Sequence, residues 1–151
     1  MSAEPILQQI QNARLDHVSI AVHSIQKALG LYRDILGGRP DQAGTNDRAG
    51  FRVQTLKLPN GGKIELMEPS RPDSFLVRFL EQRGEGMHHI TVIVPDIHGA
   101  IELLRGHGYT PVQINLERPH WQEAFVHPKE SHGALIQLVQ SDRAELNKPY
   151  E

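Results

Sequence analysis

The chain has 151 residues, of which 38% are hydrophobic and 23% charged, and its formal net charge is -2. This composition is typical of a globular protein, and the charge argues against nucleic acid or an anionic membrane as a partner. The sequence contains no cysteine, which excludes disulfides, thiolate metal ligands and cysteine nucleophiles. Any metal ion would therefore be bound by nitrogen and oxygen ligands, and nine histidines are present to supply nitrogen.

The N-terminal segment predicts a short helix rather than a targeting signal. Met1 to Ile10 lacks the basic start and apolar centre of a signal peptide, and no apolar run approaches the roughly 20 residues that span a bilayer. We therefore expect a cytoplasmic protein without a membrane partner. Apolar residues at Ile6 and Leu7 predict a leading helix, so residues 1–14 are interpreted as a helical N-terminal extension.

A strand and a helix follow. Leu15–Val22 is a short apolar run rich in β-branched residues, which predicts a strand. Ser24 is a good N-cap, and apolar residues then recur at helical spacing until Gly37 and Gly38. The composition of residues 40–50 predicts a loop.

The rest of the first half predicts a β-hairpin. Phe51–Leu58 alternates apolar and polar residues, Asn60-Gly61 favours a tight turn, and residues 63–68 return as the partner strand. The first half is thus a β-α-β-β unit, with room for one more short strand after Gly38. A short helix is predicted over Ser74–Gln82.

The second half repeats this pattern. His89–Val94 predicts a strand, Asp96 can cap a helix, and that helix should end near Gly106-His107-Gly108. His88 alternates away from His89, so we expect it to face outward or toward a partner subunit. Three further strands are predicted over Tyr109–Ile114, Gln122–Val126 and Ala134–Val139, followed by a polar tail over residues 141–151.

One internal offset relates the two halves. His17 and His89 are separated by 89 − 17 = 72 residues, and Glu65 and Gln137 by 137 − 65 = 72. Each half therefore has an imidazole on its first strand and a carboxylate or amide on its last. The same offset relates Val22 to Val94, Ile25 to Ile97, Ala28 to Ala100, Leu31 to Leu103 and Gly61 to Gly133.

These four residues predict a metal site. If each unit curls its sheet and the two units pair about a pseudo-twofold axis, the first and last strands of both converge. His17, Glu65, His89 and Gln137 would then offer two nitrogen and two oxygen ligands to a divalent ion such as Zn, Co, Ni, Mn or Fe(II). The alternative is that the histidines are hydrogen-bonded strand residues and that Glu65 faces solvent.

Several motifs resemble the vicinal oxygen chelate superfamily, which is also known as the glyoxalase, bleomycin resistance and dioxygenase superfamily. The resemblance covers roughly Leu15 to Gln140. Within the superfamily the sequence most resembles the methylmalonyl-CoA epimerases, and glyoxalase I is a more distant relative. The segment Arg83-Gly-Glu-Gly-Met-His-His-Ile90 is its most specific part. The other motifs are Tyr32-Arg-Asp-Ile-Leu-Gly37, Ile64-Glu-Leu-Met-Glu-Pro69, Phe125-Val-His-Pro-Lys129 and Gly133-Ala-Leu-Ile-Gln-Leu138.

The resemblance implies an α+β fold in which two tandem βαβββ modules form a cupped mixed sheet around a metal site. It places the first module over residues 15–72, a connecting helix over 73–87 and the second module over 88–140. It also implies a homodimer, a small-molecule substrate such as an acyl-CoA thioester, and a glutamate that shuttles a proton next to a metal-chelated carbonyl. Carried over by position, the metal ligands are His17, Glu65, His89 and Gln137.

The sequence departs from the epimerase pattern at one of these places. The epimerases have a proton-transferring glutamate where this chain has Gln137, and an amide cannot act as a base at neutral pH. Their other base precedes the central strands, where Asp47 is the acidic residue of the segment Thr45–Gly50. We therefore hypothesise that Glu65 is both ligand and catalytic base, in a metal-dependent isomerase or lyase.

Two other functions remain open. Two histidines and one carboxylate also suit a non-haem Fe(II) dioxygenase, which occurs in the same superfamily. A non-enzymatic small-molecule binding protein is the second alternative, and tight stoichiometric metal would count against it. For the substrate, the candidates are Arg118, His120 and Trp121, together with Lys129, which would suit an anionic tail at the cavity mouth. The alternative is a solvated loop with one packed Trp.

Overall fold

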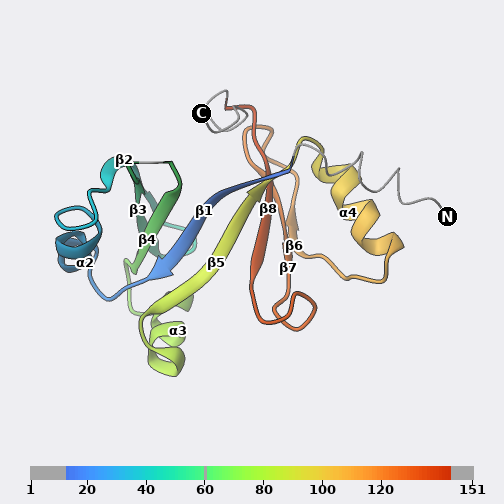
Figure 1. The fold of residues 1–151 in the computed structure, drawn as a ribbon. Coiled ribbons are helices and arrows are strands. Elements are labelled where there is room, and N and C mark those ends of the chain that lie inside the picture. Colours follow the sequence, from blue (N-terminus) through green and yellow to red (C-terminus); the bar gives the residue numbers. More distant parts are fainter. Residues whose placement is uncertain (1–12, 60, 144–151) are drawn as a thin grey trace. The chain divides into compact units, whose positions relative to one another are not determined.

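The computed structural model describes residues 13–59 and 61–143 and shows an α+β fold (Figure 1). The helix predicted within residues 1–14 and most of the tail predicted over 141–151 lie outside the described residues. The described residues form two compact units, one within His17–His88 and the other made of residues 13–16 and 89–143. No helix in the described ranges has both the length and the apolar composition needed to cross a membrane.

The first unit contains a four-stranded mixed sheet in the order β2-β3-β4-β1. Strand β1 is parallel to β4, whereas the β2–β3 and β3–β4 pairs are antiparallel. In chain order the elements are β1 (Arg14–Ala21), α2 (Ile25–Tyr32), β2 (Arg39–Asn46), β3 (Phe51–Lys57), β4 (Lys63–Pro69) and α3 (Phe75–Arg83).

The second unit has the same connectivity. Its sheet order is β5-β8-β7-β6, with β5 parallel to β8 and the β8–β7 and β7–β6 pairs antiparallel. Both units therefore follow the order β-α-β-β-β, which confirms the predicted tandem modules. The elements are β5 (Gly86–Ile93), α4 (Ile97–Gly106), β6 (Val112–Asn115), β7 (Gln122–Val126) and β8 (Ile136–Gln140).

The helix starts are set by the predicted capping residues. The Ser24 side chain accepts a hydrogen bond from the Lys27 amide, and Asp96 accepts one from the Gly99 amide. After α2 the chain turns sharply at Gly38, where a Cβ atom would lie 2.6 Å from the Tyr32 carbonyl oxygen. Glycine is required there because that carbonyl belongs to the backbone and cannot move aside easily.

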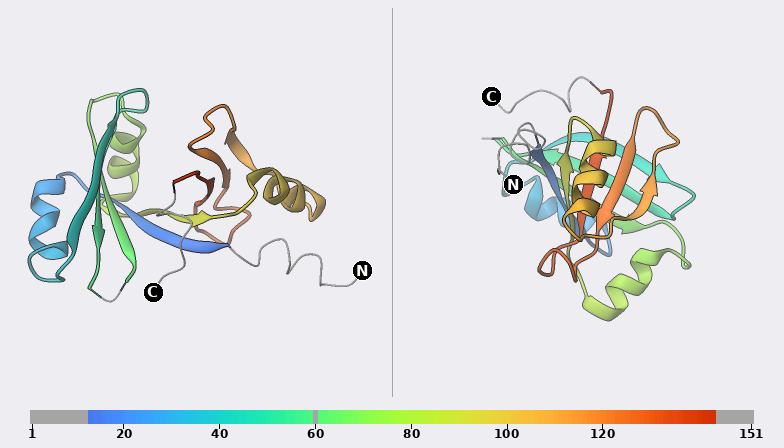
Figure 2. Two further views of the ribbon diagram at one scale, coloured as in Figure 1. Left: turned by 90° about the horizontal axis from the view of Figure 1, so that it is seen from above. Right: turned by 90° about the vertical axis from the view of Figure 1, so that its right-hand side faces the viewer.

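The sheet of the first unit is packed on both faces (Figure 2). Helix α2 covers one face, where Leu29 packs with Leu56 and Leu66. Helix α3 covers the end of the other face, where Leu76 and Leu80 pack against Ala21 and Met67. Strand alternation places His17, Ser19 and Ala21 together on this second face.

In the second unit one helix covers one face of the sheet. Ile97 and Ile101 of α4 pack against Val94 and Ala124. The opposite face carries Ile93 and Val139, with Trp121 packed against them. Because side chains alternate along a strand, His89 and Thr91 lie on the same face as Ile93, away from α4.

Two strand predictions were wrong in detail. Residues 39–46 form strand β2, which is the additional strand allowed for after Gly38, although the composition of 40–50 predicted a loop. All eight residues of β2 are exposed, so this edge strand has no apolar alternation from which to detect it, and its pairing is irregular between Pro40 and Ala43. Strand β6 spans Val112–Asn115 rather than 109–114.

His88 is half buried and packs against α3 of the first unit, so it does not simply face outward; the expectation that it faces a partner subunit stays a prediction. Its ring centroid lies 4.9 Å from that of Phe79 and 5.6 Å from that of Phe75, both on α3. Burial lowers the pKa of His88, and the nearby Arg83 guanidinium lowers this pKa further. The folded protein therefore favours the neutral imidazole more strongly than the unfolded chain does.

This pKa shift predicts a pH dependence of stability. Because the folded pKa lies below the ordinary value of 6.5, protonation favours the unfolded chain. The contribution of His88 is fully present above that value and is lost as pH falls toward the folded pKa. The urea concentration at the unfolding midpoint of the parent protein should fall as the pH is lowered through 6.5. We expect this fall to be smaller in His88→Phe. His98→Gln, at an exposed histidine of α4, is the control; an unchanged pH dependence in His88→Phe would contradict this assignment.

Candidate metal site

The first unit brings together two of the predicted ligands. His17 on β1 is buried, and its Nε2 lies 3.7 Å from Oε2 of Glu65 on β4. The Ser19 hydroxyl donates a hydrogen bond of 2.8 Å to the other carboxylate oxygen, Oε1. This arrangement follows from the parallel pairing of β1 and β4, which sets Ser19 directly beside Glu65.

The second unit repeats this arrangement with different chemistry. Thr91 on β5 lies beside Gln137 on β8, and the Thr91 hydroxyl donates a hydrogen bond of 2.7 Å to Gln137 Oε1. The offset of 72 holds for both members of the pair, since 91 − 19 = 72 and 137 − 65 = 72. His89 is buried two residues before Thr91, on the same face of β5. Each unit thus presents a histidine, a hydroxyl and an oxygen acceptor on one face.

One polar residue of this face was missed from the sequence. Glu123 on β7 accepts a hydrogen bond of 2.6 Å from Gln137 Nε2 and one of 3.0 Å from Trp121 Nε1, both through its Oε2. In the ladder, Glu123 is paired with Val139, whereas the corresponding pair of the first unit is Val53 with Met67. The chain therefore has a carboxylate where its own repeat has an apolar residue.

The change of offset in β7 explains why Glu123 was missed. Val139 follows Met67 by 72 residues, but Glu123 follows Val53 by 123 − 53 = 70. The loop before the last strand is two residues longer in the second unit, so a search at a fixed offset passes over Glu123. The detectable signal was a polar residue next to the apolar Ala124 and Phe125 of a predicted strand.

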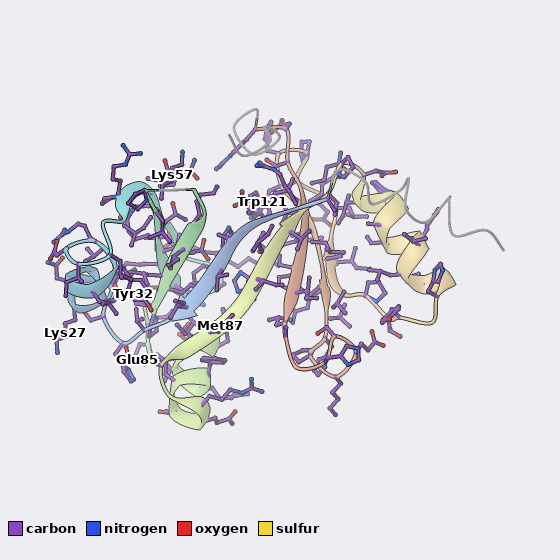
Figure 3. All side chains as sticks on the ribbon, in the orientation of Figure 1. Lys27, Tyr32, Lys57, Glu85, Met87 and Trp121 are labelled. Carbon is purple, nitrogen blue, oxygen red and sulfur yellow. The ribbon has the colours of Figure 1, made fainter. Side chains whose placement is uncertain are left out.

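The three predicted substrate-binding residues differ in burial and in their contacts. Trp121, labelled in Figure 3, is half buried against Ile93 and Val139. His120 is exposed, and its Nδ1 pairs with the Asp142 carboxylate. Arg118 is also exposed. Trp121 is thus the one of the three that contacts a residue of the polar face, Glu123.

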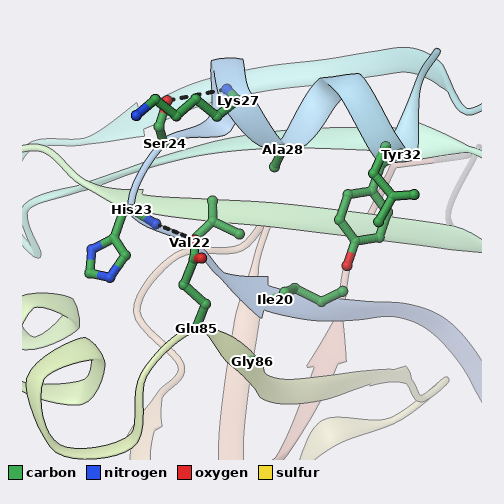
Figure 4. Close-up of a pocket in the computed structure, with 10 residues that line it drawn as sticks. Ile20, Val22, His23, Ser24, Lys27, Ala28, Tyr32, Glu85 and Gly86 are labelled. Carbon is green, nitrogen blue, oxygen red and sulfur yellow. Dashed lines mark hydrogen bonds between the residues drawn. The ribbon is translucent and has the colours of Figure 1, made fainter. Parts of the chain in front are cut away.

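A separate pocket of about 470 Å³ lies in the first unit (Figure 4). It lies between α2, the end of β1 and the segment Glu85-Gly86, and Glu85 Oε2 accepts a hydrogen bond from the His23 amide. Ile20 and Val22 line it, and by strand alternation they point to the face opposite to His17. The pocket is therefore distinct from the polar face of the sheet.

The donor chemistry of the polar residues fits a divalent metal ion. His17 and Glu65 of the first unit, and His89 of the second unit, are side chains of the types that bind such an ion. Two imidazole nitrogens and one carboxylate oxygen suit Zn and the neighbouring first-row metals. All three residues belong to the set predicted from the sequence.

Comparison with known proteins decides the family. The family model described as the Glyoxalase/Bleomycin resistance protein/Dioxygenase superfamily matches residues 16–125. The chain belongs to this superfamily. The mitochondrial methylmalonyl-CoA epimerase of Homo sapiens is 33% identical over 131 residues, which cover 85% of this chain and 74% of the human protein.

Solved structures of superfamily members agree with the fold. The methylmalonyl-CoA epimerase of Mycobacterium tuberculosis has a TM-score of 0.76 and 31% identity, covering 89% of this chain and 91% of its own. A variant of the Streptomyces coelicolor methylmalonyl-CoA epimerase has a TM-score of 0.74 and 30% identity, covering 86% of this chain and 98% of its own. The latter was solved in complex with 2-nitronate-propionyl-CoA.

Proposed function

We propose that this superfamily member is a metal-dependent isomerase or lyase that removes a proton next to a carbonyl or thioester group. The observation that carries the proposal is the environment of Glu65. This carboxylate lies within 3.7 Å of an imidazole nitrogen and accepts a hydrogen bond from a buried hydroxyl. A carboxylate that lies between a histidine and a hydroxyl donor in this way is suited both to binding a metal ion and to transferring a proton.

We propose that His17, Glu65 and His89 bind the metal ion, with Gln137 as a neutral oxygen ligand. Histidine and carboxylate are the ligands expected for such an ion in a chain without cysteine. When bound, the ion supplies Lewis-acid stabilisation of the negative charge that develops on a substrate oxygen.

The two carboxylate oxygens of Glu65 have different roles, one in metal binding and the other in proton transfer. Oε2 is the oxygen that faces His17, so it is the one that would hold a metal ion together with the imidazole. Oε1 accepts the Ser19 hydrogen bond and keeps a second lone pair. With that lone pair Oε1 takes the α-proton from the substrate carbon, and the C–H bonding electrons pass to the carbonyl oxygen as an enolate. The same oxygen returns the proton after rearrangement.

Ser19 holds the carboxylate in one orientation during this transfer. The residue is fully buried, and its hydroxyl donates directly to the oxygen that accepts the proton. A fixed donor keeps Glu65 from rotating and so maintains the distance to the substrate carbon. The Thr91 hydroxyl does the same for Gln137 in the second unit.

We propose an acyl-CoA thioester as the substrate class. The human relative is named as a methylmalonyl-CoA epimerase, and the Streptomyces coelicolor structure contains a CoA compound. A thioester carbonyl makes the adjacent C–H acidic enough for a carboxylate base when the oxygen is stabilised. Arg118 and His120 are exposed cationic or ionisable side chains that suit an anionic CoA tail.

Solvent deuterium exchange tests the proposal. The purified protein is incubated in D₂O with a small panel of acyl-CoA thioesters, with and without prior removal of metal, and deuterium at the α-carbon is followed by NMR. We expect metal-dependent incorporation for at least one thioester. Incorporation that persists unchanged without metal, or none from a protein with stoichiometric metal, would contradict the proposal. Oxygen consumption in the same sample would instead indicate dioxygenase chemistry.

A further inference from the structure

Glu123 has no role in the function proposed above, although its carboxylate directly contacts Gln137. We propose that Glu123 is a positioning residue for metal binding. It orients the Gln137 amide so that Oε1 is the atom offered as a ligand, and it adds a negative charge beside the ion. The inference rests on the proposed role of Gln137 as a ligand.

The hydrogen bonds determine which way the amide points. A carboxylate has only acceptor atoms, so the Gln137 atom that lies 2.6 Å from Glu123 Oε2 must be the NH₂ nitrogen. The oxygen Oε1 is then on the side of Thr91, whose hydroxyl donates to it. An amide oxygen has two lone pairs, and one remains for a metal ion after the Thr91 hydrogen bond.

The position of Glu123 follows from the sheet. Phe125 is paired with Gln137, and Glu123 is paired with Val139, so these four side chains share one face of the β7–β8 pair. Trp121 lies two residues before Glu123 and packs against Val139, and its indole N–H holds the same carboxylate oxygen. Glu123 is half buried and fixed by two donors, Trp121 and Gln137.

The charge of the ligand set gives the second reason. Glu65 is the one anionic member of the four proposed ligands, because neutral imidazoles and an amide bring no charge. A divalent ion would therefore be left with a net positive charge. The Glu123 carboxylate compensates for it through the Gln137 amide, in the way that carboxylates commonly support metal-bound histidines.

Comparison of the two units shows that the carboxylate of Glu123 occurs in the unit whose last-strand residue is the amide Gln137. In the first unit the last-strand ligand is Glu65, which carries its own charge, and the counterpart of Glu123 is the apolar Val53. In the second unit the last-strand residue is Gln137, and the neighbouring strand carries Glu123. The carboxylate therefore lies on the last strand of the first unit, as Glu65, and on the neighbouring strand β7 of the second unit, as Glu123.

The test is the metal affinity of Glu123→Gln, measured by competition with a chromophoric chelator for Zn²⁺. A glutamine at 123 can meet Gln137 with either its oxygen or its nitrogen, so it neither fixes the amide nor carries charge. We expect the affinity to fall by about 10- to 100-fold, as for other residues that support metal ligands. The control Glu117→Gln changes an exposed glutamate of the same unit and should bind Zn²⁺ like the parent protein.

A second variant guards against a folding defect. Glu123→Val reproduces the residue of the first unit and should fold with a circular dichroism spectrum like that of the parent, yet show the same weakened Zn²⁺ affinity. The double variant Glu123→Gln, Gln137→Glu keeps one carboxylate and one amide in contact. It should recover most of the Zn²⁺ affinity. Parent-like affinity in Glu123→Gln, or in Gln137→Ala, would overturn the inference. Tight, Glu123-dependent Zn²⁺ binding without α-hydrogen exchange would instead contradict the proposed function alone.

Discussion

Glu65→Gln is expected to slow exchange of the substrate α-hydrogen with solvent by about 10²- to 10⁴-fold. Glutamine retains an oxygen that can accept the Ser19 hydrogen bond and approach a metal ion, but it cannot accept a proton at neutral pH. Loss of a general base typically costs about 10²- to 10⁴-fold in rate. The measurement is the initial rate of deuterium incorporation by the metal-loaded variant, followed by NMR.

The control for Glu65→Gln is Glu81→Gln, at an exposed glutamate of α3. This variant loses a carboxylate at an exposed position outside the proposed ligand set and should exchange at the parent rate. Metal content is measured in both variants, so that a loss of rate can be separated from a loss of metal. A metal-loaded Glu65→Gln that exchanges at the parent rate would show that another residue is the base.

The second large effect is expected on metal affinity. His17→Ala and His89→Ala each remove one proposed nitrogen ligand, and each should weaken Zn²⁺ binding by at least about 100-fold, more than the loss of a group that only supports a ligand. The two effects should be similar, because the histidines occupy equivalent places in the two modules. Competition with a chromophoric chelator measures both.

His98→Ala is the matched control for these two variants, since His98 is an exposed histidine of α4. Its Zn²⁺ affinity should equal that of the parent. If only one of His17 and His89 affected binding, the ion would be bound by one module alone. Such a result would contradict the proposal that both histidines are ligands of one ion.

The repeat could be read from the sequence because it preserves strand register. The offset of 72 that relates His17 to His89 also relates the hydrogen-bonded pair Ser19 and Glu65 to Thr91 and Gln137. Parallel pairing of the first and last strands in each unit fixes these positions, so a short pattern was sufficient to predict them. The α+β fold and the tandem modules were predicted for the same reason.

The remaining features depend on properties that a fixed pattern does not contain. Strand β2 is held by backbone pairing with β3 while all its side chains are exposed, so its composition is that of a loop. Glu123 was missed because a longer loop changes the offset in β7. Trp121 could be placed only once its contacts with Glu123, Ile93 and Val139 were known. The homodimer and the cytoplasmic location stay predictions.

The central proposal is that His17 and His89 are ligands of one metal ion. X-ray absorption at the Zn edge of the protein loaded with one equivalent of Zn²⁺ tests it most directly, because imidazole ligands can be counted from their outer-shell scattering. The account predicts one ion per chain with two imidazole ligands, and one imidazole in His17→Ala or His89→Ala. A single imidazole in the parent protein, or a parent spectrum unchanged by either substitution, would contradict it.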